Sequence, residues 1–198
     1  MIRVVLASLL LFSTNSFAQQ IVGNPRKANS VYAILQTNMG DIRIKLFHDK
    51  ARNTVNNFIG LALGKKESVD PTIRKKTKKA FYNGLTFHRV VPNFVIQGGD
   101  PLGNGKGGPG YGIDQEINSD LNFTYPGMVA MAAAKPEKNG SQFFITLKDQ
   151  NDLDGAFTIF GQVVDGFEVV KHIAGVKRDL FDRPVKDVVI RHIKIQYR

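Results

Sequence analysis

Short apolar runs separated by turn-forming residues are the feature that most limits how this chain can fold. Eight such runs follow residue 30, at residues 31–36, 41–47, 86–91, 94–97, 127–132, 142–146, 158–164 and 188–196. Runs of this length suit β-strands and are too short for most helices. The regular spacing of short strands predicts a closed barrel or a sandwich.

Two other segments have the spacing of amphipathic helices. In residues 51–63, apolar side chains such as Val55, Phe58 and Ile59 recur three or four positions apart, and Gly64 follows as a stop. A second helix is predicted over residues 167–173. The first helix is expected to cover one open side of a sheet.

The N-terminus has the pattern of an export signal over residues 1–18. Arg3 precedes an apolar run, and Ser16-Phe17-Ala18 supplies small residues at the positions that a signal peptidase reads. The apolar run is shorter than the ~20 residues that span a bilayer, and no cysteine is present to carry a lipid. We therefore expect a cleaved signal peptide, a flexible leader at residues 19–30, one domain at residues 31–198 and a periplasmic or secreted location.

The charge is strongly positive, formally +10, and much of it lies in residues 65–79, here called the basic insertion. Its cations are Lys65, Lys66, Arg74, Lys75, Lys76, Lys78 and Lys79. Charge runs of this kind are usually solvated loops, so a loop with weak binding to anionic surfaces is expected. No aromatic residue lies among these cations, which disfavours specific nucleic-acid binding.

Two longer motifs carry the functional information. The first runs from Phe87-His88-Arg89 through Phe94 to Gln97-Gly98-Gly99-Asp100, and the second is Asn139-Gly140-Ser141-Gln142-Phe143-Phe144. Together they bring a guanidinium, two amides and several phenyl rings close to glycines. Such a mixture suits a surface that grips an apolar group beside a polar amide, as in a bound peptide.

In these two motifs the chain resembles the cyclophilin family of peptidyl-prolyl cis-trans isomerases, in particular an exported bacterial member. The resemblance extends from about residue 31 to residue 198. It implies a mainly β fold, namely a closed antiparallel eight-stranded barrel capped by two α-helices. It also implies an enzyme that accelerates X-Pro rotation during folding of exported proteins and acts on proline-containing polypeptides. We expect a monomer.

The resemblance assigns roles to individual residues. Arg89 matches the catalytic arginine, and Gln97 and Gln142 match the glutamines that position it or bind the peptide. The substrate-binding positions are Phe94, Val95, Ala132, Ala133, Ala134, Phe144, Leu153 and Phe157. Without the resemblance, these aromatic residues would be read as core residues and the arginine as a surface ion-pair partner.

Rotation about an X-Pro bond needs no nucleophile, metal or cofactor, because its barrier is the lost amide resonance. An apolar pocket and a strong hydrogen-bond donor are sufficient in principle. No cofactor or metal is expected here. The four histidines lack metal-ligand spacing, there is no cysteine, and His88 is interpreted as structural.

Three positions depart from the family pattern. Many members have Asn at Ala133, Trp at Asp152 and His at Phe157. The missing Trp leaves cyclosporin binding open. Two other readings also remain: a non-catalytic module that binds proline peptides as a chaperone, and a basic barrel that binds nucleic acid or anionic lipid.

Overall fold

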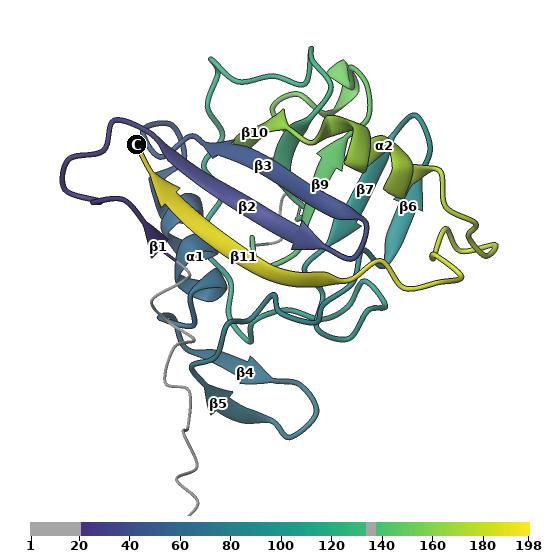
Figure 1. Cartoon of the computed structure of the whole chain (residues 1–198), viewed down its shortest axis with the longest axis horizontal. Helices are drawn as coiled ribbons and strands as arrows, with labels where there is room; N and C mark the ends of the chain where they lie inside the picture. The colour runs from purple at the N-terminus through teal and green to yellow at the C-terminus, as the bar shows by residue number, and fades with distance from the viewer. Residues whose placement is uncertain (1–20, 134–137) are drawn as a thin grey trace, which may run out of the picture.

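The structure, a computed structural model, describes residues 21–133 and 138–198 and contains one strongly curved sheet with two helices against it (Figure 1). The expected signal peptide, the first two residues of the leader and Ala134 lie outside the described residues.

The main sheet has the strand order β1-β11-β2-β3-β10-β8-β9-β7-β6. Its strands are β1 (Ile21–Val22), β2 (Val31–Thr37), β3 (Gly40–Leu46), β6 (Arg89–Val91), β7 (Val95–Gly98), β8 (Met128–Met131), β9 (Phe143–Thr146), β10 (Ile159–Asp165) and β11 (Ile190–Tyr197). Every pair of neighbours is antiparallel except β1 and β11, which are parallel. All eight strands predicted from the apolar runs are confirmed, each within a few residues of its predicted ends.

Both predicted helices are also confirmed, as α1 (Arg52–Ala62) and α2 (Phe167–Ala174). They lie at different ends of the curved sheet (Figure 1). Gly166 precedes α2 with a φ of 77°, and a Cβ at this position would lie 2.2 Å from the carbonyl oxygen of Asp41. A side chain is therefore excluded where the chain enters α2. No helix in the described part of the chain is long and apolar enough to cross a bilayer.

The expected closed barrel is not what forms. The hydrogen-bonded sheet has two ends, at β1 and β6, and an isolated bridge between Thr86 and Val189 lies near one of them. Beyond β6 lies a turn rather than a strand, and it accepts one hydrogen bond from the amide of Val90 through the carbonyl of Asp182. β6 has three residues, and Pro184 of this turn pairs with Arg178 rather than with β6, so no regular ladder continues there.

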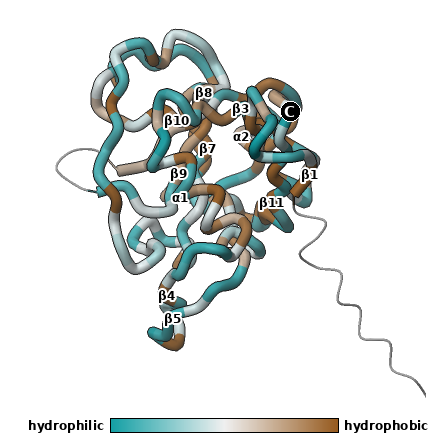
Figure 2. Tube along the Cα trace, turned by 90° about the vertical axis from the view of Figure 1, so that its left-hand side faces the viewer, coloured by the Kyte–Doolittle hydropathy of each residue, from teal (hydrophilic) through white to brown (hydrophobic). Residues whose placement is uncertain are grey.

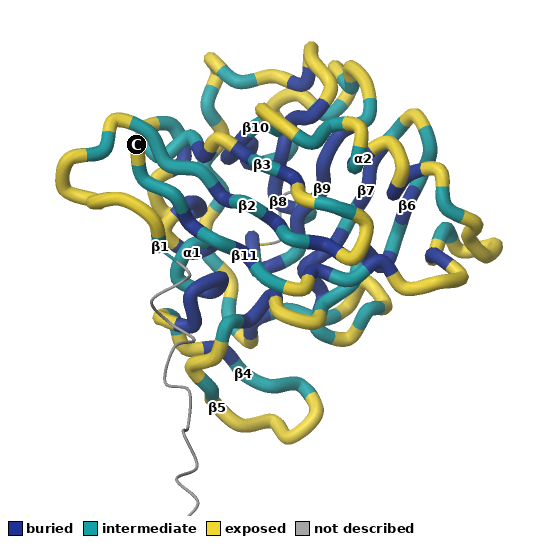
Figure 3. The backbone as a smooth tube through the Cα atoms, viewed as in Figure 1, coloured by how far each residue is buried: buried dark blue, intermediate teal, exposed yellow. Residues whose placement is uncertain are grey.

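Two segments expected to lack regular structure pair as strands. Ile21 and Val22, from the predicted leader, pair with Ile195 and Gln196 of β11. In the basic insertion, β4 (Ser68–Asp70) and β5 (Lys75–Thr77) form a hairpin that projects from the domain (Figure 1). The basic insertion was expected to be a solvated loop. Its residues are mostly exposed, as expected, but part of its backbone forms a hairpin instead of a loop (Figure 3).

Carboxylates explain how so basic a hairpin forms. Lys76 Nζ lies 2.8 Å from Glu67, and Lys79 Nζ lies 2.7 Å from Asp70. These ion pairs place opposite charges beside the lysines and lower the pKa of both Glu67 and Asp70.

The strands are buried on both faces where the site forms. Hydrophobic residues concentrate in the central strands and α1 (Figure 2), and buried positions follow the same elements (Figure 3). In β9, Phe143 and Ile145 point into the main core, whereas Phe144 belongs to a second apolar cluster on the opposite face. This alternation follows the two-residue period of a strand. The second cluster is the base of the site described next.

Candidate active site

A cavity of about 220 Å³ lies over the second apolar cluster, on the face of the sheet away from the main core. Eight of the residues predicted from the sequence line it: Arg89, Phe94, Val95, Gln97, Ala132, Phe144, Leu153 and Phe157. Residues from three strands, from the 3₁₀ turn and from the segments next to β7, β8 and β10 thus meet at one place.

The floor of the cavity is aromatic. The Phe144 ring stacks on Phe123 with centroids 5.8 Å apart, and it meets Phe157 edge-on at 5.3 Å. Phe144 is 5% exposed and Phe123 is fully buried. These contacts fix the rings, so the apolar floor is formed before any ligand binds. Phe123 was missed by the sequence reasoning, because its neighbours Asn122 and Thr124 gave no sign of a functional position.

The polar wall begins at β6 with Arg89. Strand registers pair Arg89 with Gln97 and Gln97 with Phe144, so these three residues form a row across β6, β7 and β9. Residues directly opposite in neighbouring strands place their side chains on one face. The guanidinium carbon of Arg89 is 5.9 Å from the centroid of Phe94, and Nη1 donates to Gln97 Oε1 over 3.5 Å. The charged fork therefore sits at the edge of the apolar floor.

Two glutamines continue the polar wall. Gln97 Nε2 donates to Gln142 Oε1 over 3.0 Å. Gln142 Nε2 in turn donates to the carbonyls of Gly105 and Gly107, at 3.0 and 2.8 Å. Through two amide side chains, hydrogen bonds thus connect Arg89 to residues 103–110, here called the glycine-rich loop.

Asp100 holds this loop in place. It is 1% exposed, and its carboxylate accepts hydrogen bonds from the backbone amides of Leu102, Asn104 and Gly105. A Cβ on Gly107 would lie 1.9 Å from Asp100 Oδ1, so the loop closes onto the carboxylate only with glycine there. Asp100 was part of the first sequence motif but received no role, because its partners are backbone groups that a sequence does not display.

A second hollow of about 590 Å³ adjoins the first and shares Gln97 and Ala132 with it. Gln142 and Ala133 line this second hollow rather than the first. The carbonyl of Ala133 accepts a hydrogen bond from Gln115 Nε2 over 2.7 Å, so one group of the expected peptide-binding edge already has a partner. Ala134, the third residue of that edge, lies outside the described residues.

Comparison with known proteins identifies this arrangement. The family model for "Cyclophilin type peptidyl-prolyl cis-trans isomerase/CLD" matches residues 32–195. The chain belongs to the cyclophilin family. It is accordingly a peptidyl-prolyl cis-trans isomerase, an enzyme that catalyses rotation about X-Pro bonds.

Relatives of this chain align with it over nearly their whole length. Peptidyl-prolyl cis-trans isomerase B of Streptomyces anulatus is 47% identical over 86% of this chain and 99% of its own. Peptidyl-prolyl cis-trans isomerase A of Mycobacterium tuberculosis is 47% identical over 82% and 91%. A cyclophilin-type isomerase of Cryptosporidium parvum, solved in the presence of the dipeptide Ala-Pro, has a TM-score of 0.74 and 32% identity over 84% of this chain and 99% of its own.

His88 lies beside the cyclophilin site but faces away from solvent. It is 7% exposed, and neither ring nitrogen has a hydrogen-bond partner among the described residues. Burial lowers the pKa of His88, and the nearby Asp100 opposes this shift. The ring therefore favours its neutral form, in keeping with the structural role expected for it.

The three departures from the family pattern lie in different parts of the site, and Ala133 lines the second hollow. Asp152 is exposed on the 3₁₀ turn Asn151–Leu153, while Leu153 turns into the cavity. Phe157 contributes its ring to the floor. Within residues 21–133 and 138–198, no three His, Asp or Glu side chains are grouped to hold a metal ion.

Proposed function

We propose that this cyclophilin acts on exported polypeptides and that Arg89 is the group that stabilises the twisted prolyl amide. The observation that supports the residue roles is the row Arg89, Gln97 and Phe144, which sets a charged donor beside an apolar floor. A pocket without such a donor would bind proline but would not favour rotation.

The proposed mechanism uses the pocket and the donor together. Phe94, Phe144 and Leu153 hold the proline ring while the preceding residue turns. As the amide twists, its nitrogen loses double-bond character and becomes a better hydrogen-bond acceptor, which the guanidinium then engages more strongly. Each ~1.4 kcal/mol gained in the twisted state alone is worth a factor of ten in rate.

Gln97 and Gln142 act in this mechanism by positioning the guanidinium of Arg89. Gln97 accepts from Arg89 and so limits the orientations of the guanidinium. Gln142, fixed by two loop carbonyls, holds Gln97 in turn. We assign peptide backbone binding to the edge at Ala132 and Ala133, with Ala134 and Val95 retained as substrate-binding positions from the family pattern.

Substitution of Arg89 tests the assignment. Arg89→Ala should lower the isomerisation rate of a short X-Pro peptide at least tenfold (about 1.4 kcal/mol), and Arg89→Lys should restore it only in part, because a point charge lacks the planar fork. Arg191, which is exposed on β11, provides the control Arg191→Ala. Rates are measured by exchange NMR with circular dichroism as a fold check. Full activity in Arg89→Ala would show that another group acts on the amide.

The alternative of a non-catalytic proline-peptide chaperone makes a different prediction for the same assay. A binding module would saturate with peptide without accelerating cis-trans exchange. Wild-type exchange rates above the uncatalysed rate therefore separate the two.

Export and assembly state are further parts of the proposal. Residues 1–18 support a cleaved signal peptide, and N-terminal sequencing of the mature protein should begin at Gln19. Recovery of the uncleaved chain from the cytoplasm would contradict it. We also propose a monomer, so sedimentation equilibrium should give the mass of a single chain.

A further inference from the structure

A turn at residues 177–185, between α2 and β11, presents two adjacent apolar side chains to solvent. Leu180 is 100% exposed and Phe181 is 86% exposed. Backbone hydrogen bonds join the segments that enter and leave the turn. The amide of Val185 donates to the carbonyl of Lys177 over 2.9 Å, and the amide of Asp179 donates to the carbonyl of Arg183 over 2.8 Å. Single exposed apolar residues are ordinary on protein surfaces, but an adjacent pair at the tip of a structured turn is not.

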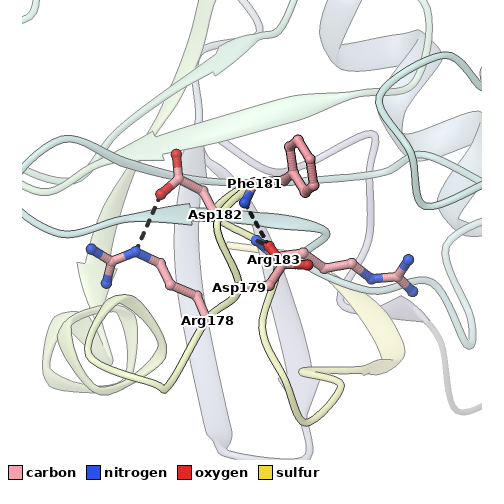
Figure 4. Close-up of polar contacts among 5 residues, drawn as sticks. All are labelled: Arg178, Asp179, Phe181, Asp182 and Arg183. Atoms are coloured by element: carbon pink, nitrogen blue, oxygen red, sulfur yellow. Dashed lines mark hydrogen bonds and ion pairs between the residues drawn. The ribbon is translucent and has the colours of Figure 1, made fainter.

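Polar contacts hold the backbone of this tip in one shape (Figure 4). One oxygen of Asp179 accepts from the amides of Phe181 and Arg183, at 2.8 and 3.0 Å. Arg178 Nε donates to Asp182 over 3.2 Å. The two apolar side chains are thus displayed on a preorganised frame, which reduces the entropy lost when a ligand binds them.

The turn is attached to the strand that carries Arg89. The amide of Val90, the next residue of β6, donates to the carbonyl of Asp182 over 2.8 Å. The turn lies beyond β6 at the edge of the sheet (Figure 1). Adjacent strands are about 4.8 Å apart, and an extended peptide advances about 3.3 Å per residue. A residue about four positions from a proline held beside Arg89 can therefore reach the tip.

We propose that Leu180 and Phe181 form a second binding site for apolar side chains of the same polypeptide whose proline occupies the pocket. This inference rests on the proposed function. The first cavity, at about 220 Å³, holds little more than the proline and its neighbours, and the adjoining hollow of about 590 Å³ is lined by the glycine-rich loop and by Ala132 and Ala133. Neither is lined by residues of the turn, so the turn would add a separate contact for substrate residues that extend past β6. Unfolded polypeptides expose apolar side chains that an apolar tip would recognise.

Charge argues against an anionic membrane as the occupant of this tip. The guanidinium of Arg178 is paired with Asp182, and the carboxylate of Asp179 lies in the same turn. The turn also contains Lys177 and Arg183, so its three cations face two carboxylates and its net charge is +1. An apolar peptide segment fits a surface that is apolar and close to neutral.

The test compares two kinds of peptide on one double variant, Leu180→Ser with Phe181→Ser. A short blocked X-Pro peptide is too small to reach the tip, so its turnover should not change. Longer peptides, with Leu-Phe placed four residues before or after the proline, should bind the wild type about tenfold more tightly than matched Ser-Ser peptides. The double variant should lose this preference.

Val22→Ser is the matched control, since Val22 is 49% exposed on β1, far from the turn (Figure 1). Thermal unfolding should be unchanged in both proteins. Asp179→Ala, which removes the two backbone contacts at the tip, should weaken binding of the longer peptide without changing short-peptide turnover. If the wild type failed to turn over the short peptide, the proposed function itself would be wrong.

Three outcomes would overturn the inference while leaving the isomerase intact. The first is equal affinity of the wild type for the Leu-Phe and Ser-Ser peptides. The second is concentration-dependent self-association that the double variant abolishes while long-peptide affinity is unchanged. The third is binding to anionic vesicles that depends on Leu180 and Phe181, again with unchanged peptide affinity.

Discussion

Replacing Phe144 separates the binding role of the pocket floor from its structural role. Phe144 is 5% exposed and contacts the rings of Phe123 and Phe157. Removal of a buried phenyl ring typically costs about 3–5 kcal/mol of unfolding free energy. Because the vacated space joins a cavity that is already open, we expect Phe144→Ala to fall near the lower value, about 3 kcal/mol.

Phe144→Leu is the graded comparison. It retains apolar bulk but loses both ring contacts, each worth about 0.5–1.5 kcal/mol beyond area burial. We therefore expect a loss of about 1–3 kcal/mol. For a chain of this size, 1 kcal/mol corresponds to about 2–4 °C in Tm, so Phe144→Ala should unfold roughly 6–12 °C below the wild type.

Urea unfolding gives the stability change, and titration with X-Pro and X-Ala peptides gives the binding change. The wild type should prefer the X-Pro peptide, and both variants should reduce this preference. The reasoning fails if Phe144→Ala keeps its full preference for X-Pro, or if its unfolding free energy stays within 1 kcal/mol of the wild type.

Three further predictions follow from contacts around the site. Asp100→Asn should destabilise the protein by about 1–3 kcal/mol and slow short-peptide turnover, because an amide nitrogen cannot accept hydrogen bonds from the loop N–H groups. Unchanged turnover would show that the glycine-rich loop does not influence Arg89. Burial lowers the pKa of His88 below its value in the unfolded chain, so the contribution of neutral His88 to stability is complete above about pH 6.5 and is lost as pH falls toward the folded pKa. Between pH 7.5 and pH 5, the unfolding free energy measured in urea should therefore decrease less for His88→Gln than for the wild type. Equal decreases in the two proteins would show that His88 does not cause the pH dependence. Replacing the five cations of residues 74–79 with Gln should weaken salt-sensitive binding to heparin or anionic vesicles without changing turnover of a neutral peptide, whereas lost turnover would place the hairpin at the active site.

Sequence periodicity predicted the strands and helices because their apolar faces repeat at regular intervals. It could not predict how the sheet ends, since that depends on whether the partner beyond β6 can form a ladder. The chain beyond β6 turns around Asp182 and pairs with itself, through Pro184 and Arg178, and neither feature is visible in the apolar runs. The β4–β5 hairpin was missed for a related reason, because its lysines are paired with Glu67 and Asp70 in space.

The candidate site was predictable where side chains face the ligand and less so where they face the backbone. Arg89, Gln97 and Phe144 lie in motifs that resemble the cyclophilins, and the structure brings them together. Asp100 and Gln115 act on backbone amides and carbonyls, which every residue possesses. A motif therefore names the residues around a ligand but not those that support the loops holding it.

The position of β11 in the sheet determines when during synthesis this enzyme can complete its fold. β11 lies between β1 and β2, and its register pairs Tyr197 with Val31. At about 5–20 residues per second, a ribosome finishes β11 roughly 8–30 s after β2. During that interval the edge of β2 has no partner, and the N-terminal half of the sheet cannot complete its core. The enzyme thus acquires its own fold late, once its last strand has been made.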